Sequence, residues 1–372
     1  MVKVLVVDDS ALMRKHLTDL LGSDGGYEVR TARNGAEALV AIEEFDPDVV
    51  TLDVNMPEMD GITCLSRIMT QRPKPVLMVS SLTEEGAEAT LQALSLGAVD
   101  FVHKPGGTIS LSIDRIRREL LFKVRAAVGA RVRRAVGLRG RLRAERDRIA
   151  GRTGTSSRRS LATGTRAGFG LVLIGVSTGG PGTLEEIVPL LPADFPWAVL
   201  IAQHMPATFT SVFARRLGEM SRVPVVEVSR QMPIEAGTVY VAKGDADLVI
   251  GKRAAGPIAT PVPSSGDFVW HPSVARLVAS AVEAFPAERL IGVELTGMGD
   301  DGAEQMADLN QRGGRTIAQD AETSVVFGMP NELIRRGGAD LVLPADRIAA
   351  QLIHWVEPTP AARAGRARSW CS

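Results

Sequence analysis

A serine in a glycine-rich turn is the first residue whose setting suggests chemistry. In LVLIGVSTGGPG, residues 171–182, an apolar run leads into Ser177, which is flanked by glycines at 175, 179 and 180, and helix-type sequence begins at Thr183. Ser177 is therefore a candidate nucleophile, and backbone N–H groups at the start of the next helix are candidate donors to an oxyanion. The same pattern also fits an anion-binding loop, or a serine that caps the helix.

A histidine and two acids occupy similar positions further along the chain. The run WAVLIAQ ends at His204, and LIGVELTGMGDDGAEQM places Asp300 and Asp301 after an apolar strand and a glycine-rich turn. A histidine at a strand end can act as the base for a nucleophile on the neighbouring strand, and a carboxylate can orient its imidazole. We therefore predict a triad of Ser177, His204 and Asp301, with Asp300 as the rival acid.

A second set of polar residues follows the strands of the first part of the chain. Asp8 and Asp9 follow VKVLVV, Asp53 ends VVTLD, Ser80 ends the fourth apolar run, and Lys104 follows the fifth. Three carboxylates packed together repel one another unless a hard cation lies between them, and oxygen ligands suit Mg²⁺. Any one of these aspartates alone would also fit a turn or a helix cap.

The elements that must position these residues alternate between short apolar strands and amphipathic helices. In residues 2–128 the strands VKVLVV, EVRTA, VVTLD, PVLMVSS and DFVHK are separated by helix-length stretches. This order favours a parallel, doubly wound α/β sheet, in which binding sites lie beyond the carboxyl ends of the strands. The same alternation after residue 170 predicts a second domain of the same class.

Composition limits the protein class. The chain has 372 residues, 45% of them hydrophobic, with 43 acidic and 43 basic residues, so charge gives no argument for nucleic-acid binding. The only cysteines are Cys64 and Cys371, which excludes a disulfide framework. The start MVKVLVVDDS is too short in apolar residues for a signal peptide or an anchor. We expect a cytoplasmic protein.

The first part of the chain resembles response-regulator receiver domains through VVDDSALMR, LDVNMPEMDG, VLMVSS and DFVHKP. The resemblance implies that Asp53 accepts a phosphoryl group from a histidine kinase. It also implies that Asp8, Asp9, Asp53 and the carbonyl of Asn55 hold Mg²⁺, and it assigns switch roles to Ser80, Phe101 and Lys104. Phosphorylation would add about −1.5 to −2 charges there.

The later motifs resemble the catalytic domain of chemotaxis protein-glutamate methylesterases. They are GVSTGGPGTLE, QHMPATFTSVFARRL, GTVYVAKGD, HPSVARL, LTGMGDDGAEQM and TIAQDAETSVVFGMP. The resemblance implies hydrolysis of glutamate methyl esters on methyl-accepting chemotaxis receptors, and probable deamidation of particular glutamines, with Ser177, His204 and Asp301 as the triad. For the oxyanion we predict the backbone N–H groups near Thr178 and Met298. Ester hydrolysis would need no cofactor, and membrane receptors would be met only peripherally.

Together the two resemblances predict a receiver, flavodoxin-like domain at 1–125 and a Rossmann-like methylesterase domain at 169–356. Between them, residues 126–168 are rich in arginine and glycine and are predicted to form a flexible linker. Residues 357–372 are predicted to be a disordered tail. In the family the unphosphorylated receiver restricts access to the catalytic face, so we expect phosphorylation to regulate the esterase.

Two departures and two alternatives accompany this interpretation. Where family members often carry a histidine after a VYIAPG-like segment, VYVAKGDAD has Lys243 and Asp247. Both lie outside the predicted triad, so we expect them to affect receptor choice and domain docking. One alternative is a receiver-controlled anion- or nucleotide-binding module without hydrolysis, which leaves His204 and Asp301 unexplained. The other, a transcriptional regulator, lacks a helix-turn-helix.

Overall fold

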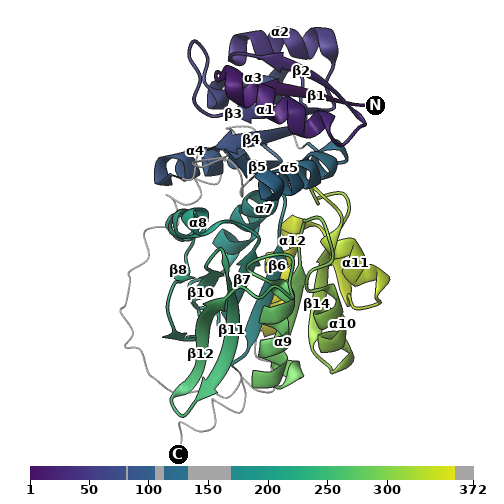
Figure 1. The fold of residues 1–372 in the computed structure, drawn as a ribbon. Helices are drawn as coiled ribbons and strands as arrows, with labels where there is room; N and C mark the ends of the chain where they lie inside the picture. Colours follow the sequence, from purple (N-terminus) through teal and green to yellow (C-terminus); the bar gives the residue numbers. More distant parts are fainter. Residues whose placement is uncertain (81–82, 105–112, 133–168, 357–372) are drawn as a thin grey trace, which may run out of the picture. The chain divides into compact units, whose positions relative to one another are not determined.

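The computed structural model describes residues 1–80, 83–104, 113–132 and 169–356 (Figure 1). The chain divides into two compact units, the first built on a five-stranded sheet and the second on a seven-stranded sheet. Residues 133–168 of the predicted linker and the predicted tail at 357–372 lie outside the described residues. None of the described helices is both long enough and apolar enough to cross a membrane.

The first unit alternates strands and helices in chain order. Its elements are β1 (Val2–Val7), α1 (Ala11–Gly22), β2 (Tyr27–Ala32), α2 (Gly35–Phe45), β3 (Val49–Asp53), α3 (Gly61–Gln71), β4 (Val76–Ser80), α4 (Glu84–Ser95), β5 (Asp100–His103) and α5 (Ile113–Val128). All five predicted strands are present. Because α5 continues to Val128, residues 126–128 of the predicted linker are helical.

The five strands are parallel and lie in the order β2-β1-β3-β4-β5. The strand order therefore changes direction between β1 and β3: β2 is added on one side of β1, and the later strands are added on the other. Folds of this kind place their binding sites at that point, beyond the carboxyl ends of the strands. Polar caps begin the helices that follow the strands: Ser10, Asn34 and Asp60 each accept a hydrogen bond from a backbone N–H in the first turn of α1, α2 and α3.

The second unit begins with β6 and contains a larger sheet. Its elements are β6 (Leu171–Val176), α7 (Gly180–Ile187), the 3₁₀ helix η1 (Val188–Leu190), β7 (Ala198–Gln203), α8 (Ala207–Met220), β8 (Val225–Val228), β9 (Met232–Pro233), β10 (Val239–Ala242), β11 (Ala246–Arg253), β12 (Gly256–Pro263), α9 (Val274–Ala284), the 3₁₀ helix η2 (Ala287–Arg289), β13 (Leu290–Glu294), α10 (Ala303–Gln311), β14 (Arg315–Gln319), α11 (Met329–Arg335), β15 (Leu341–Leu343) and α12 (Ala345–Val356).

The seven parallel strands lie in the order β15-β14-β13-β6-β7-β10-β8. Strands β6, β7 and β13 are buried along their whole length, as expected for a parallel sheet covered on both faces. Helices α9, α10 and α11 pack side by side, as do α7, α8 and α12. The first strand, β6, has later strands on both sides, so the crevice at its carboxyl end is the expected place for a site.

An antiparallel sheet also belongs to the second unit, and sequence analysis did not predict it. Strands β11 and β12 form a long hairpin, and β9 pairs with the other side of β12. In Figure 1 the hairpin stands beside β10 and α9. Prolines at 257, 261 and 263 make β12 hard to predict as a strand from its sequence. Proline has no backbone N–H to donate to a neighbouring strand, so it is uncommon within sheets. The hairpin ends in the chain segment that leads to α9.

Candidate active site

Ser177 is held at the turn between β6 and α7. Its backbone N–H donates to the Thr296 carbonyl at 3.0 Å, and its own carbonyl accepts from the Gln203 side chain at 3.0 Å and from Gly180 N at 2.8 Å. Only 9% of the residue is exposed. Gly179 has φ of +79°, a conformation that an L residue adopts at a cost. The predicted strand-turn-helix setting is present, and the backbone around the serine is fixed from three sides.

Thr296 ties this turn to the loop that follows β13. Besides accepting from Ser177 N, it donates its hydroxyl to the Thr178 carbonyl at 2.8 Å, and its N–H donates to Gln319 Oε1 at 2.8 Å. Gly297, the next residue, packs against Ser177, because a Cβ at that position would lie 2.7 Å from Ser177 Cβ. The main chain that leads into Met298 therefore runs directly beside the serine.

His204 directly follows β7 and donates its backbone N–H to the Val176 carbonyl at 3.1 Å. Its ring Nε2 lies 2.9 Å from Asp301 Oδ2, while its buried Nδ1 has no hydrogen-bond partner in the described part of the chain. The ring also stacks on Trp270, with centroids 5.7 Å apart. With Nε2 occupied by the carboxylate, Nδ1 is the nitrogen left to exchange a proton.

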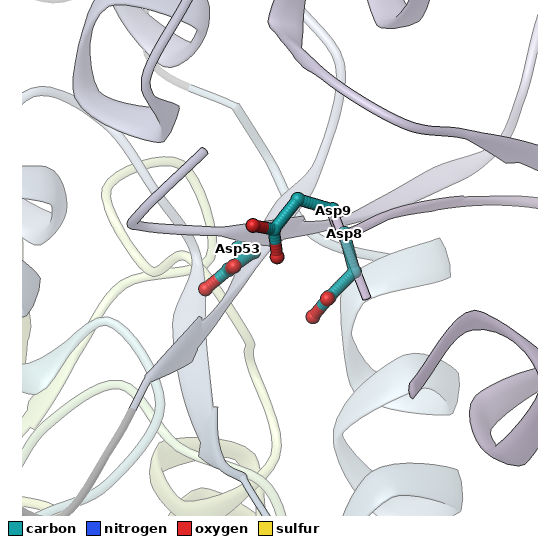
Figure 2. A group of neighbouring side chains, drawn as sticks. All are labelled: Asp8, Asp9 and Asp53. Carbon is teal, nitrogen blue, oxygen red and sulfur yellow. The ribbon is translucent and has the colours of Figure 1, made fainter. Parts of the chain in front are cut away.

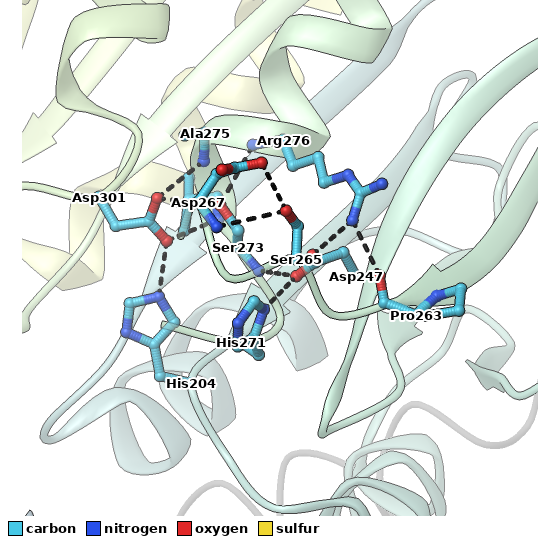
Figure 3. A network of polar contacts seen from close by, with 11 residues as sticks. His204, Asp247, Pro263, Ser265, Asp267, His271, Ser273, Ala275, Arg276 and Asp301 are labelled. Carbon is cyan, nitrogen blue, oxygen red and sulfur yellow. Dashed lines mark hydrogen bonds and ion pairs between the residues drawn. The ribbon is translucent and has the colours of Figure 1, made fainter. Parts of the chain in front are cut away.

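Asp301 is the predicted acid that contacts the imidazole. Its carboxylate also accepts from Val274 N at 2.7 Å, from Ala275 N at 3.0 Å and from the Ser273 hydroxyl at 3.2 Å (Figure 3). Burial alone would raise the pKa of this carboxyl, but the hydrogen bonds from His204 and the two backbone groups outweigh it, so the pKa lies below its ordinary value. This favours the ionised form of Asp301 beside the imidazole of His204.

Asp300, the rival acid, lies elsewhere. Its side chain is 67% exposed, and Arg336 Nη2 lies 3.9 Å from its carboxylate. Of these two acids, Asp301 is the one that contacts His204.

Asp247, one of the two departures, is joined to this site. Its carboxylate is fully buried and accepts hydrogen bonds of 2.8 Å from His271 Nδ1, Ser273 N and Arg276 Nη1 (Figure 3). Burial raises its pKa, and these donors lower it further than burial raises it. We expected this departure to affect receptor choice and docking more than the chemistry, and spacing along the chain gave no indication of the connection.

Glu294, at the end of β13, is a further buried acid that sequence analysis missed. It is fully buried, and neither carboxyl oxygen has a hydrogen-bond partner within the described residues. Burial first, and then the charge of Asp301, raise its pKa well above the ordinary value, which favours the protonated form of this acid. The one feature of the sequence that could have indicated it is an acidic residue within the otherwise apolar run LIGVEL. Trp270 was also missed, because its one signal was an aromatic residue in front of the HPSVARL motif.

The first unit brings its carboxylates together. Oxygens of Asp8, Asp9 and Asp53 lie within 4.8 Å of one another (Figure 2). Lys104 Nζ lies 2.7 Å from Asp53 Oδ2 and 3.1 Å from Asp8 Oδ2. Burial raises the pKa of Asp53, with hydrogen bonding to Lys104 opposing it and the charge of Asp8 adding to it. A cluster of hard oxygen atoms with excess negative charge fits Mg²⁺.

The other predicted receiver residues are Asn55, Ser80 and Phe101. The Asn55 backbone N–H donates to Asp53, and Ser80 is buried at the end of β4, the strand next to β3. Phe101 in β5 is 2% exposed, and Lys123 Nζ lies 4.7 Å from its ring centroid. Lys104 N donates to the Ser80 carbonyl at 2.7 Å, which links the ends of β4 and β5.

Known families match both units. The model of the CheB methylesterase family matches residues 172–352, and that of the response regulator receiver domain matches residues 4–113. The chain is 63% identical to protein-glutamate methylesterase/protein-glutamine glutaminase 3 of Rhodospirillum rubrum over 360 residues, which is 96% of this chain and 97% of the relative. It is 46% identical to a Vibrio cholerae protein of the same name, over 90% of this chain and 91% of that protein.

A solved structure is also similar. The CheB methylesterase catalytic domain of Thermotoga maritima is 39% identical, with a TM-score of 0.48, and the match covers 50% of this chain and 97% of that domain.

Proposed function

Since this chain belongs to the CheB methylesterase family and carries a response regulator receiver domain, we propose that it hydrolyses glutamate methyl esters on methyl-accepting chemotaxis receptors. We further propose that it deamidates particular receptor glutamines, as the names of its relatives indicate. The observation that carries the proposal is the hydrogen bond of 2.9 Å between His204 and Asp301 beside the turn that presents Ser177.

The reaction begins with Ser177 as the nucleophile. His204 Nδ1 takes the serine proton while Oγ bonds to the ester carbonyl carbon, and Asp301 stabilises the imidazolium that forms. The imidazolium then returns the proton to the leaving oxygen, so that methanol departs and a glutamyl ester of Ser177 remains. Water, deprotonated by His204, attacks this ester and releases glutamate and the free serine. For a glutamine the first leaving group is ammonia.

The oxyanion that forms at each attack requires donors beside Ser177. We assign this role to the backbone N–H groups of Thr178 and Met298. The support is the close packing of Gly297 on Ser177 and the start of α7 at Gly180, since the N–H groups at a helix N-terminus attract negative charge. Each such donor contributes about 3 kcal/mol to the transition state.

Regulation is assigned to the first unit. A histidine kinase of the chemotaxis pathway would transfer a phosphoryl group to Asp53, with Asp8, Asp9, Asp53 and the Asn55 carbonyl holding Mg²⁺. The ion supplies charge neutralisation for the incoming phosphoryl group. Lys104, already paired with Asp53 and Asp8, would pair with the phosphoryl oxygens, and Ser80 would donate to one of them. Ser80 and Phe101 would then report the modification to the rest of the protein.

The decisive experiment uses receptor membranes methylated with a radiolabelled methyl group. Full-length protein should release labelled methanol, faster with a small phosphodonor and Mg²⁺ than without. Protein carrying Ser177→Ala should release none above background. An anion-binding module without hydrolysis would bind small anions and leave the label on the membranes, which would refute the proposed reaction.

A further inference from the structure

Asp247 is a buried charge outside the proposed triad. It is the second residue of β11, and its carboxylate has no exposed surface. A carboxylate in such a place is strongly unfavourable unless it is well paired, since burial removes its hydration. Two cationic or ionisable side chains, His271 and Arg276, and one backbone N–H compensate it.

All three donors come from one short segment of the chain. Residues 271–276 contain the approach to α9, its N-cap Ser273 and its first turn. Arg276 also donates to the Pro263 carbonyl at 2.9 Å, so its guanidinium joins this segment to the end of β12 as well as to Asp247. The carboxylate therefore fastens the beginning of α9 to the β11–β12 hairpin.

The same segment holds Asp301. Val274 N and Ala275 N, which lie at the start of α9, donate to its carboxylate, and the Ser273 hydroxyl adds a third hydrogen bond. A helix N-terminus favours a carboxylate because its free N–H groups and its dipole both point toward the negative charge. Ser273 serves both acids at once: its N–H donates to Asp247, and its hydroxyl donates to Asp301.

We propose that Asp247 is a positioning residue of the active site, which acts on Asp301, and through it on His204, by fixing residues 271–276 (Figure 3). The proposal rests on the catalytic roles assigned above. Without the charge of Asp247, Arg276 and His271 lose their shared anionic partner, and the N-terminus of α9 is held less firmly. Asp301 then holds the imidazole less firmly in the orientation that the proton transfer requires.

The test measures how fast Ser177 reacts with a fluorophosphonate, a probe that needs the triad but no receptor. In the full-length chain, Asp247→Asn should slow this labelling on the order of tenfold. With methylated receptors the same variant should lower kcat and leave KM unchanged, because the receptor surface is intact. The matched control is Asp308→Asn, which removes the acid of an exposed Asp308–Arg312 pair in α10 and should label at the wild-type rate.

His271 provides a second, independent variant that does not empty a buried site. His271→Ala removes the donor to Asp247 and should slow labelling, whereas His271→Asn places an amide N–H where Nδ1 was and should restore most of the rate. Circular dichroism and thermal unfolding establish that each protein is folded. A uniform loss of stability without a change in the labelling rate would show that Asp247 serves only the fold.

A double-mutant cycle tests the route of the effect. If Asp247 acts through the segment that Ser273 caps, the losses from Asp247→Asn and Ser273→Ala should be less than additive in the double variant. Wild-type labelling by Asp247→Asn, or equal rates for both His271 variants, would overturn the inference. Failure of the wild-type protein to be labelled at Ser177 would instead overturn the proposed function.

Discussion

The ring of His204 stacks on the indole of Trp270, with planes 16° apart and centroids separated by 5.7 Å. Trp270 is half-buried and lies in the segment that leads to α9, next to His271. The indole covers one face of the imidazole, and Asp301 accepts a hydrogen bond at one of its edges. The hydrogen bond to Asp301 restrains rotation of the imidazole within its own plane. The stack on Trp270 restrains tilting of the ring out of that plane.

Removing the indole should weaken this hold. Aromatic contacts of this kind contribute about 0.5–1.5 kcal/mol, so Trp270→Leu should slow fluorophosphonate labelling of Ser177 about threefold to tenfold. Trp270→Phe keeps a ring over the imidazole and should retain most of the rate. Stopped labelling reactions followed by mass spectrometry give both values. Equal rates for the leucine and phenylalanine variants would show that the stack has no role in the reaction.

Loss of any proposed triad member should remove nearly all esterase activity. Ser177→Ala and His204→Ala should each lower methanol release on the order of 10⁴ to 10⁶, and Asp301→Asn should lose activity with its fold intact. Asp300→Asn is the matched control, because Asp300 is adjacent in sequence but exposed, and it should stay active. Substantial methanol release by Ser177→Ala would remove the serine from the mechanism.

Phosphorylation of the first unit should depend on Mg²⁺ and on Asp53. A small phosphodonor should give an acyl phosphate that hydroxylamine cleaves, and EDTA should prevent its formation. Asp53→Asn should abolish labelling, whereas Asp46→Asn, at an exposed acid paired with Lys74, should leave it unchanged. Undiminished labelling of Asp53→Asn would place the acceptor elsewhere.

Glu294 should make stability depend on pH. Its pKa is raised in the folded protein, so the folded state keeps a proton that the unfolded state releases above about pH 4.3. The free energy of unfolding therefore falls as pH rises from there toward the folded pKa. Glu294→Gln carries no such proton, so its melting temperature relative to wild type should increase from pH 4.5 to pH 8.

Two comparisons make the Glu294 experiment specific. The change of side chain is expected to shift the melting temperature by an amount that does not depend on pH. The proton on Glu294 is reported only by how the difference in melting temperature changes with pH. Glu304→Gln, at an exposed acid on α10, is the matched surface control. A flat difference between Glu294→Gln and wild type would mean that Glu294 is ionised in the folded protein.

The proposed regulation predicts that the unphosphorylated receiver lowers the esterase activity of the second unit. In the proposed arrangement the unmodified receiver limits access to the esterase, and a tethered receiver stays at high effective concentration. Removing residues 1–165 should then raise basal methanol release and make it insensitive to phosphodonor. A folded fragment, judged by circular dichroism, that is no more active than the full chain would rule out simple inhibition.

Alternating patterns and strand ends were enough to predict much of this protein. The strands of the first sheet and the turn at Ser177 follow from local sequence, because apolar runs and glycines act over a few residues. The meeting of His204 with Asp301 follows from a general property of parallel sheets, whose carboxyl ends share one edge. These predictions required no knowledge of side-chain packing.

The remaining features depend on contacts that cross the fold. Asp247 reaches the site only because the β11–β12 hairpin packs on α9, and the prolines of β12 concealed that hairpin. Trp270 contacts His204 although no repeat or spacing joins them. An acid such as Glu294 is not expected in a buried strand from the sequence pattern. Its place in the interior, near the charge of Asp301, is known only from the structure. Long-range packing of this kind has no local signal.

The hydrogen bonds of Thr296 have a consequence for how the enzyme is made. They anchor the turn at Ser177 to a loop far downstream and, through Gln319, to the end of β14. On the ribosome the receiver strands are complete after His103 and can fold while the rest is still being translated. The proposed nucleophile and base emerge before Thr296 and Gln319, which anchor the turn at Ser177. A nascent or truncated chain that stops before β14 lacks Gln319, which accepts a hydrogen bond from Thr296, so we expect it to carry Ser177 and His204 before the turn at Ser177 is fully anchored.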